Sequence, residues 1–243
     1  MDIFNSWLVN KYIAHRGLHN ETFAENSISA FKNAVDNGYA IELDVQQIAD
    51  GTVVVFHDDS LQRLTGQDGY LRNIPTERDL CNYKLEGTED TIPTFKEVLK
   101  VIDGATPLLI EIKNNGKVGA LENAVLELLK NYKGEYAIQS FNPYVLAYFK
   151  TNAPEITRGQ LSGSFKKEKM SWITKVVLRH MTLNKRVSQP HFISYEAEAL
   201  PNLHVKKFKH LPLLAWTIRS QEQYHDIIKH CDNIIFENFI PKI

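Results

Sequence analysis

The stretch Tyr39-Ala-Ile-Glu-Leu-Asp-Val45 reads as a buried β-strand that carries two acids. Apolar and acidic residues alternate along it, and in a strand this period of two places Glu42 and Asp44 on the same face. Two carboxylates aimed into a protein interior are costly unless a cation holds them. The stretch therefore predicts a strand of a sheet and, on one face of it, a divalent metal as the simplest partner.

Similar β-rich runs alternate with segments of helical period, which predicts βα units and a parallel sheet. Eight runs could close a barrel, with 52–56 as an extra or paired piece, and 243 residues is close to what one (β/α)8 barrel needs. We expect an α/β fold, a TIM-like (β/α)8 barrel, as a single domain over 1–243. The candidate strands are 12–14, 39–45, 52–56, 107–112, 135–139, 156–160, 191–195, 212–217 and 233–236.

Local signals predict where helices begin. Asn26 is expected to cap a helix, Thr94-Phe-Lys-Glu97 has the pattern of a capping box, and Asn142-Pro143 opens a further helix. The segment 58–91 breaks the βα rhythm with glycines, a proline and many polar residues. It is predicted to be an insertion in the loop that follows the strand ending at His57.

A second strand repeats the acidic pattern. In Leu108-Leu-Ile-Glu-Ile-Lys113, Glu111 and Lys113 share one face, so a third carboxylate is expected to converge with Glu42 and Asp44. Three carboxylates give an all-oxygen site that suits Mg²⁺ or Ca²⁺ better than zinc.

Two histidines are expected where barrel strands meet their C-terminal loops, the face at which barrel enzymes react. His15 lies in Ala14-His-Arg-Gly17, and His57 follows Val53-Val-Val-Phe56. Histidine titrates near neutral pH, so such a pair can serve as general acid and general base. Arg16 and Lys113 would supply fixed positive charge for a phosphate.

Composition limits the partners and the compartment. With 28 basic and 29 acidic residues the net charge is −1, so no global field attracts nucleic acid. The N-terminus lacks the basic start and apolar run of a signal peptide, and we expect a cytoplasmic protein. Cys81 and Cys231 lie far apart without metal-ligand spacing, which favours buried thiols in a reducing compartment.

An ordered set of motifs from about residue 11 to 236 resembles the glycerophosphodiester phosphodiesterase family. Each motif is weak alone, but their order and spacing together are specific. They are His15-Arg-Gly17, Glu25-Asn-Ser27, Glu42-Leu-Asp44-Val45, Asp50-Gly51, His57-Asp-Asp-Ser-Leu-Gln-Arg63, Ile92-Pro-Thr94, Glu111-Ile-Lys113, Gln139-Ser-Phe141 and Trp216-Thr217.

The resemblance implies a TIM barrel and assigns roles to the acidic and basic residues. Glu42, Asp44 and Glu111 would hold one divalent cation, Mg²⁺ or Ca²⁺, with His15 and His57 as acid and base. Arg16 and Lys113 would stabilise the phosphate charge. In that family the glycerol 2-hydroxyl of the substrate is thought to attack phosphorus and expel the alcohol, and water then opens the cyclic phosphate. The products would be glycerol 3-phosphate and an alcohol such as choline or ethanolamine.

Two further residues have equally good functional and structural interpretations. Gln139 would hydrogen-bond the phosphate or a metal-bound water, or serve as a plain structural amide. Trp216 would pack against the glycerol carbons, or be a core aromatic. The final strand departs from the family pattern, because Glu237-Asn238 stands where the family usually has Thr-Asp.

The segment 166–186 is unusual in charge, with seven Lys or Arg against one Glu. It is either a solvated barrel helix or a peripheral helix that contacts an anionic membrane. The membrane interpretation favours an alternative function, that of a lysophospholipase D or sphingomyelinase-D-like enzyme on acylated substrates. Another alternative is a catalytically inactive barrel that binds a lipid or metabolite. The preferred head group, the ion and the oligomeric state leave no signal in the sequence.

Overall fold

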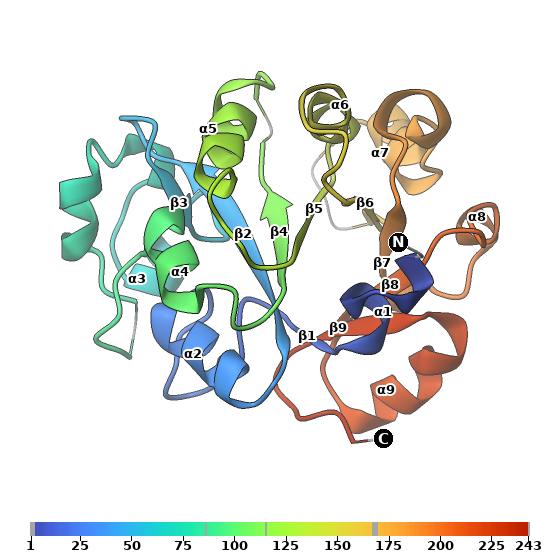
Figure 1. Ribbon diagram of the computed structural model, residues 1–243, viewed down its shortest axis with the longest axis horizontal. Helices are drawn as coiled ribbons and strands as arrows, with labels where there is room; N and C mark the ends of the chain where they lie inside the picture. The colour runs from blue at the N-terminus through green and yellow to red at the C-terminus, as the bar shows by residue number, and fades with distance from the viewer. Residues whose placement is uncertain (1–2, 86, 115, 167–169, 243) are drawn as a thin grey trace. The chain divides into compact units, whose positions relative to one another are not determined.

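The computed structural model describes residues 3–85, 87–114, 116–166 and 170–242 (Figure 1). Its contacts divide the chain into two compact units, Ala14–Tyr136 and a unit made of Met1–Ile13 with Ala137–Ile243. The short strand β1 (Ile13–Ala14) joins the two units in sequence. Strands and helices alternate along both units, which confirms the predicted α/β class.

The unit Ala14–Tyr136 is built on a long central strand. β2 (Ala40–Gln47) pairs in parallel with β4 (Leu108–Ile112) and antiparallel with β3 (Val53–Val55). The β2–β4 register sets Asp44 opposite Glu111, and this decides where their carboxylates lie. The predicted run 52–56 is thus the extra strand, paired with β2. The helices of this unit are α2 (Ile28–Asp36), α3 (Gln62–Thr65), α4 (Phe95–Ile102) and α5 (Ala120–Leu129), with 3-10 turns at Leu71–Asn73 and Glu77–Asn82.

The other unit carries parallel strands that pair in chain order. These are β5 (Tyr136–Ser140), β6 (Arg158–Ser162), β7 (Phe192–Glu196), β8 (Leu213–Ile218) and β9 (Asn233–Phe236). Its helices are α1 (Trp7–Asn10), α6 (Pro143–Asn152), α7 (Trp172–Arg179), α8 (Leu203–Lys206) and α9 (Gln221–Ile227). Short turns complete it: 3-10 at Ile3–Asn5, Ala197–Ala199 and Ile228–His230, and π-helical at Asn184–Ser188.

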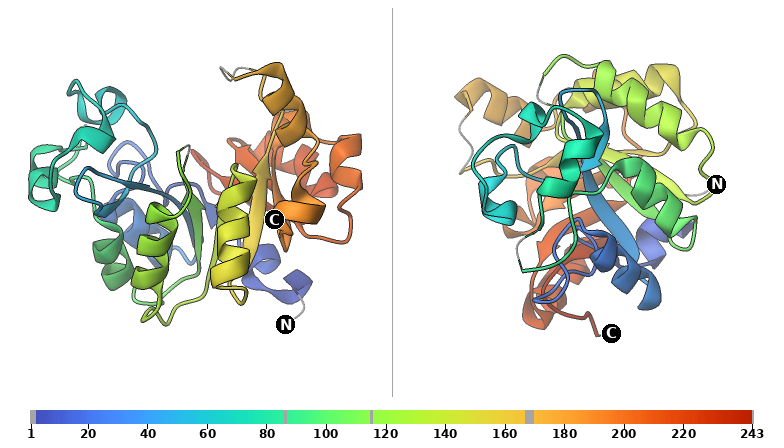
Figure 2. Two further views of the ribbon diagram at one scale, coloured as in Figure 1. Left: turned by 90° about the horizontal axis from the view of Figure 1, so that it is seen from above. Right: turned by 90° about the vertical axis from the view of Figure 1, so that its left-hand side faces the viewer.

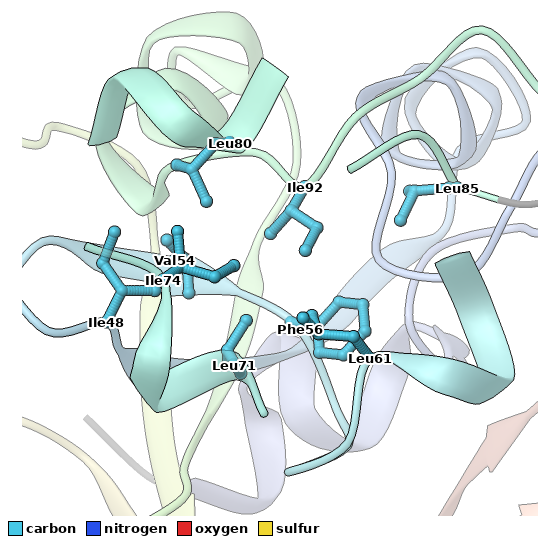
Figure 3. Packing of buried hydrophobic residues seen from close by; sticks show 9 residues of the cluster. All are labelled: Ile48, Val54, Phe56, Leu61, Leu71, Ile74, Leu80, Leu85 and Ile92. Carbon is cyan, nitrogen blue, oxygen red and sulfur yellow. The ribbon is translucent and has the colours of Figure 1, made fainter. Parts of the chain in front are cut away.

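The insertion 58–91 has an apolar core of its own, which packs on β3 (Figure 3). Leu61, Leu71 and Leu80 of the insertion are buried with Val54 and Phe56. Figure 2 shows this segment, in teal, as a lobe of short helical turns beside β3. Burial of this apolar surface fixes the start of the insertion, directly after His57, to the sheet.

Two local predictions are wrong. Ser27, and not Asn26, caps α2, since its hydroxyl accepts a hydrogen bond from the Ala30 amide at 3.1 Å. Asn26 has a φ of 57°, whereas an N-cap residue has an extended backbone. Cys81 is exposed rather than buried, and Cys231 is partly buried. The capping box at Thr94 and the Asn142 cap are present as predicted.

Among the described residues, no helix is both long enough and apolar enough to cross a membrane.

Candidate active site

Three buried carboxylates meet in the unit Ala14–Tyr136. Glu42 and Asp44 come from β2 and Glu111 from β4, and one oxygen of each lies within 4.8 Å of those of the others. Glu42 and Asp44 are each 1% exposed and Glu111 is 8% exposed. The strand period puts the first two on one face, and the parallel register adds the third.

Two cations flank this cluster. The Nζ of Lys113 lies 3.6 Å from an oxygen of Asp44 and 3.5 Å from one of Glu111. The Nε of Arg16 lies 3.4 Å from the other oxygen of Asp44, and the Arg16 backbone amide donates to Glu42 at 3.1 Å. The two cations offset part of the negative charge of the three carboxylates. The remaining negative charge lies among the carboxylates, where an ion would bind.

The environment shifts the three carboxyl groups differently. Burial, together with the charges of Asp44 and Glu111, raises the pKa of Glu42 well above its usual range. Burial also raises the pKa of Glu111, against the charge of Lys113. Burial works to raise the pKa of Asp44 as well, but the charges of Lys113, His57 and Arg16 outweigh it and lower that pKa. A cluster with two unfavourable carboxylates fits a divalent cation, whose charge would favour all three in the ionised form.

The loop after β1 brings His15 to the cluster. Its Nε2 lies 4.0 Å from an oxygen of Glu42. Gly17 holds the loop close, since its amide donates to the carbonyl of Glu42 at 3.2 Å and its φ is 80°. A Cβ at this position would lie 2.9 Å from Phe31, so only glycine fits.

His57 is held from two sides. Its Nδ1 lies 2.6 Å from the carboxylate of Asp58. The side-chain amide of Gln46, on β2, donates to the carbonyls of Phe56, His57 and Asp58 at 2.9, 3.0 and 3.2 Å. The Asp58 contact favours a proton on Nδ1, which makes Nε2 the acceptor nitrogen of the neutral ring.

Arg63 links the loops that carry the two histidines. Its Nε donates to Asp58 at 2.5 Å, and its Nη1 and Nη2 donate to the two oxygens of Glu25 at 2.8 and 2.7 Å. Glu25 in turn accepts a hydrogen bond from Arg16 at 2.6 Å. Burial opposes ionisation of Glu25, but the hydrogen bonds from Arg63 and the charge of Arg16 lower its pKa to about 2.

Asn26 takes part in the site rather than in helix capping. Its Nδ2 donates to Asp44 at 2.9 Å, while its Oδ1 accepts from the Asp44 backbone amide at 3.3 Å. These two contacts fix the rotamer of the Asp44 carboxylate.

The structure brings together seven of the residues that the sequence singled out, all within Ala14–Tyr136. They are His15, Arg16, Glu42, Asp44, His57, Glu111 and Lys113. Gln139 and Trp216 belong to the other unit, and their roles stay predictions. The side-chain amide oxygen Oε1 of Gln139 accepts from the hydroxyl of Ser194 at 2.8 Å, and Trp216 packs edge-on against Phe141 with ring centroids 5.6 Å apart. Directly after the final strand β9, the carboxylate of Glu237 accepts from Nε of Arg219 at 2.7 Å.

Five residues of the site received no such role from the sequence. Three of them, Glu25, Asp58 and Arg63, stand in the motifs quoted above. Nothing in the sequence indicated that Glu25 pairs with Arg63, which lies 38 residues further along the chain. Asn26 was interpreted as a cap because it precedes a run of helical period, Ile28, Phe31 and Val35, and Gln46 carried no signal beyond its position on the strand.

Residues 15–238 match the model of the Glycerophosphoryl diester phosphodiesterase family. A glycerophosphodiester phosphodiesterase of Caldanaerobacter subterraneus is 35% identical over 159 residues, which cover 61% of this chain and 65% of that protein. Lysophospholipase D GDPD1 of Rattus norvegicus is 37% identical over 140 residues, 53% of this chain and 43% of that protein. The match thus spans less than two thirds of either relative.

Solved structures share the fold over nearly the whole chain. An Oleispira antarctica phosphodiesterase, solved in complex with the product sn-glycerol-3-phosphate, has a TM-score of 0.79 and 24% identity, covering 95% of this chain and 93% of its own. A glycerophosphodiester phosphodiesterase from Thermotoga maritima has a TM-score of 0.71 and 27% identity, covering 93% of each chain. The predicted TIM-barrel fold is confirmed, and the chain belongs to the glycerophosphoryl diester phosphodiesterase family, whose members are phosphoric diester hydrolases.

Proposed function

We propose that the chain hydrolyses glycerophosphodiesters to glycerol 3-phosphate and an alcohol, with one divalent cation and two histidines. The observation that carries the proposal is the convergence of Glu42, Asp44 and Glu111 beside His15. Such a set combines an oxygen-rich ion site with an imidazole, a group that can take up and release a proton. The product bound to the Oleispira antarctica enzyme supports the same substrate class.

The donor set fits a hard divalent cation. Glu42, Asp44 and Glu111 would hold Mg²⁺ or Ca²⁺, which would supply positive charge next to the substrate phosphate. Asn26 would keep the Asp44 carboxylate in place, since it contacts both the side chain and the amide of that residue. Arg16 and Lys113 would stabilise the negative charge that builds up on the phosphate oxygens.

His15 and His57 would exchange protons with the substrate. One histidine takes the proton of the glycerol 2-hydroxyl as its oxygen bonds to phosphorus, and the other protonates the alcohol as its bond to phosphorus breaks. A water molecule then opens the cyclic phosphate with the two roles reversed, and glycerol 3-phosphate leaves. Asp58 would keep His57 in the tautomer that this step needs. Gln139 and Trp216 are proposed to contact the phosphate and the glycerol carbons.

The test is release of glycerol 3-phosphate from glycerophosphocholine and glycerophosphoethanolamine with added Mg²⁺, added Ca²⁺ or EDTA. We expect release that EDTA abolishes. His57→Ala and His15→Ala should each lower turnover about 100-fold or more while metal binding persists. Glu42→Gln should weaken metal binding itself, and His210→Ala, at an exposed histidine, should change neither. Full turnover by His57→Ala would disprove the two-histidine mechanism.

A second candidate is the hydrolysis of acylated diesters, as in a lysophospholipase D. It is supported by the relative of that name and by the exposed apolar residues of α7. Comparing glycerophosphocholine with lysophosphatidylcholine separates the two, because a diesterase for water-soluble substrates should prefer the deacylated compound.

We further propose that 1–243 acts as one domain, with 58–91 inserted in it, in the cytoplasm.

A further inference from the structure

Helix α7 exposes large apolar side chains to solvent. Trp172 is 73% exposed, Ile173 58% and Val176 42%. Ser171 caps the helix, since its hydroxyl accepts from the Thr174 amide at 3.1 Å, so these residues lie on a defined element. No residue of α7, all of which the structure describes, is buried. An exposed apolar cluster of this kind marks a surface that contacts another molecule or a membrane.

The exposed residues share one side of the helix. Because successive helical residues turn by about 100°, Trp172, Ile173 and Val176 fall within an arc of about 100°. Lys175 and Arg179 border this arc. The helix is therefore amphipathic toward solvent, with a strip of apolar side chains beside a strip of cations.

A different side of α7 attaches to the sheet. Val177 and Leu178 are partly buried. The carbonyl of Leu178 accepts from the hydroxyl of Ser162 on β6 at 2.9 Å, and the carbonyl of Arg179 accepts from Tyr195 on β7 at 3.4 Å. The exposed apolar strip is thus additional to the residues that hold the helix in the fold.

Helix α8 extends the same kind of surface. The ring of His204, on α8, lies against that of His180 at the C-terminal end of α7, with centroids 3.8 Å apart and the ring planes tilted by 31°. Leu203 is 72% exposed, and Lys206 and Lys207 after it are exposed as well. Apolar and cationic groups therefore recur together on both helices.

The charge around this surface decides what covers it. The segment 166–186 holds seven Lys or Arg against one Glu, in a chain whose net charge is −1. Of these residues, Lys166, Arg179, Lys185 and Arg186 are exposed, while 167–169 lie outside the described residues. An apolar strip that inserts between lipid tails, bordered by cations that meet anionic head groups, is typical of interfacial helices.

We propose that Trp172, Ile173 and Val176 of α7, with Leu203 of α8, dock on the surface of an anionic lipid bilayer. Lys175 and Arg179 would contact its head groups. The chain would then work beside a membrane. This inference does not depend on the proposed hydrolysis, because its test measures binding alone.

The test is cosedimentation of the purified chain with vesicles of phosphatidylcholine that contain or lack phosphatidylglycerol. We expect binding to the anionic vesicles at low salt, at least tenfold weaker binding to phosphatidylcholine alone, and loss of binding at high salt. Trp172 fluorescence should shift to shorter wavelength on binding. No sedimentation with anionic vesicles at low salt, or equal binding to both kinds of vesicle, would overturn the proposal.

Variants separate the apolar from the charged contribution. The triple variant Trp172→Ser, Ile173→Ser, Val176→Ser and the double variant Lys175→Glu, Arg179→Glu should each bind at least tenfold more weakly. Matched controls are Tyr144→Ser with Ile240→Ser, at exposed apolar positions elsewhere, and Lys96→Glu with Lys133→Glu, at exposed cations elsewhere. Thermal unfolding checks that each variant is folded. Unchanged binding of the triple variant would mean simple electrostatic adsorption and would overturn the inserted-helix proposal.

Discussion

The carboxylate of Asp58 lies between two partners, with one oxygen 2.6 Å from Nδ1 of His57 and the other 2.5 Å from Nε of Arg63. Burial would raise the pKa of Asp58, but the hydrogen bonds from His57 and Arg63 hold it below its usual range. Asp58 is therefore ionised at neutral pH, oriented by Arg63, and able to stabilise a protonated His57.

Asp58→Asn should lower turnover of glycerophosphodiesters about 10- to 100-fold, because an amide no longer stabilises the charged imidazole. Steady-state rates measured across pH 5 to 9 check this. Asp59→Asn, at the exposed neighbouring acid, is the control, and unchanged turnover in Asp58→Asn would argue against a role for the His57–Asp58 contact.

Arg63 should matter through the residues that it holds. Arg63→Gln removes the hydrogen bonds to both Asp58 and Glu25, so we expect turnover to fall by about tenfold. Arg72→Gln is the matched control, because Arg72 lies in the same insertion and contacts only the ring of Tyr70 among the interactions described. A merely structural role for Arg63 would lower stability and leave the turnover of the folded variant unchanged.

Local periodicity was sufficient to predict the acidic cluster. Alternation along 39–45 and 108–113 determines which residues share a face, and the parallel register between β2 and β4 then aligns Asp44 with Glu111. The Arg63 network could not be found in this way, since it joins residues 38 positions apart through the packing of the insertion on β3. Charge pairs of that separation depend on tertiary structure and have no period in the sequence.

The confusion of Asn26 with Ser27 has a physical reason. Both residue types are good caps, and they are adjacent, so sequence position alone cannot decide between them. Contacts with the strand β2 determine which of the two is the cap, because the Asp44 carboxylate and backbone amide both hydrogen-bond to the side chain of Asn26. Asn also tolerates the left-handed backbone found at this position better than most residues.

These two neighbours should separate by phenotype. Ser27→Ala should lower stability by about 1 kcal/mol through loss of the cap and leave divalent-ion affinity unchanged. Asn26→Gly, which keeps a residue suited to a φ of 57°, should weaken that affinity by about 10- to 100-fold by freeing the Asp44 rotamer. Calorimetric titration with Mg²⁺ and Ca²⁺, beside thermal unfolding of the metal-free chains, measures both. Equal ion affinity in the two variants would mean that Asn26 does not orient Asp44.

Glu25 should contribute to the pH dependence of the free energy of unfolding. Its pKa is about 2 in the folded chain against an ordinary value of 4.5, so the unfolded chain binds the proton more readily. The stabilisation is therefore fully present above pH 4.5 and is lost as the pH falls toward 2. Glu25→Gln should cost about 1 to 3 kcal/mol at pH 7 and progressively less below pH 4.5. Urea unfolding of both proteins at several pH values gives the difference in their unfolding free energies. The contributions of carboxylates that both proteins share cancel in this difference. Glu21→Gln, at an exposed position, is the control. If the loss of unfolding free energy in Glu25→Gln stayed constant down to pH 2, the substitution would have removed packing contacts and not the ion pairs with Arg16 and Arg63.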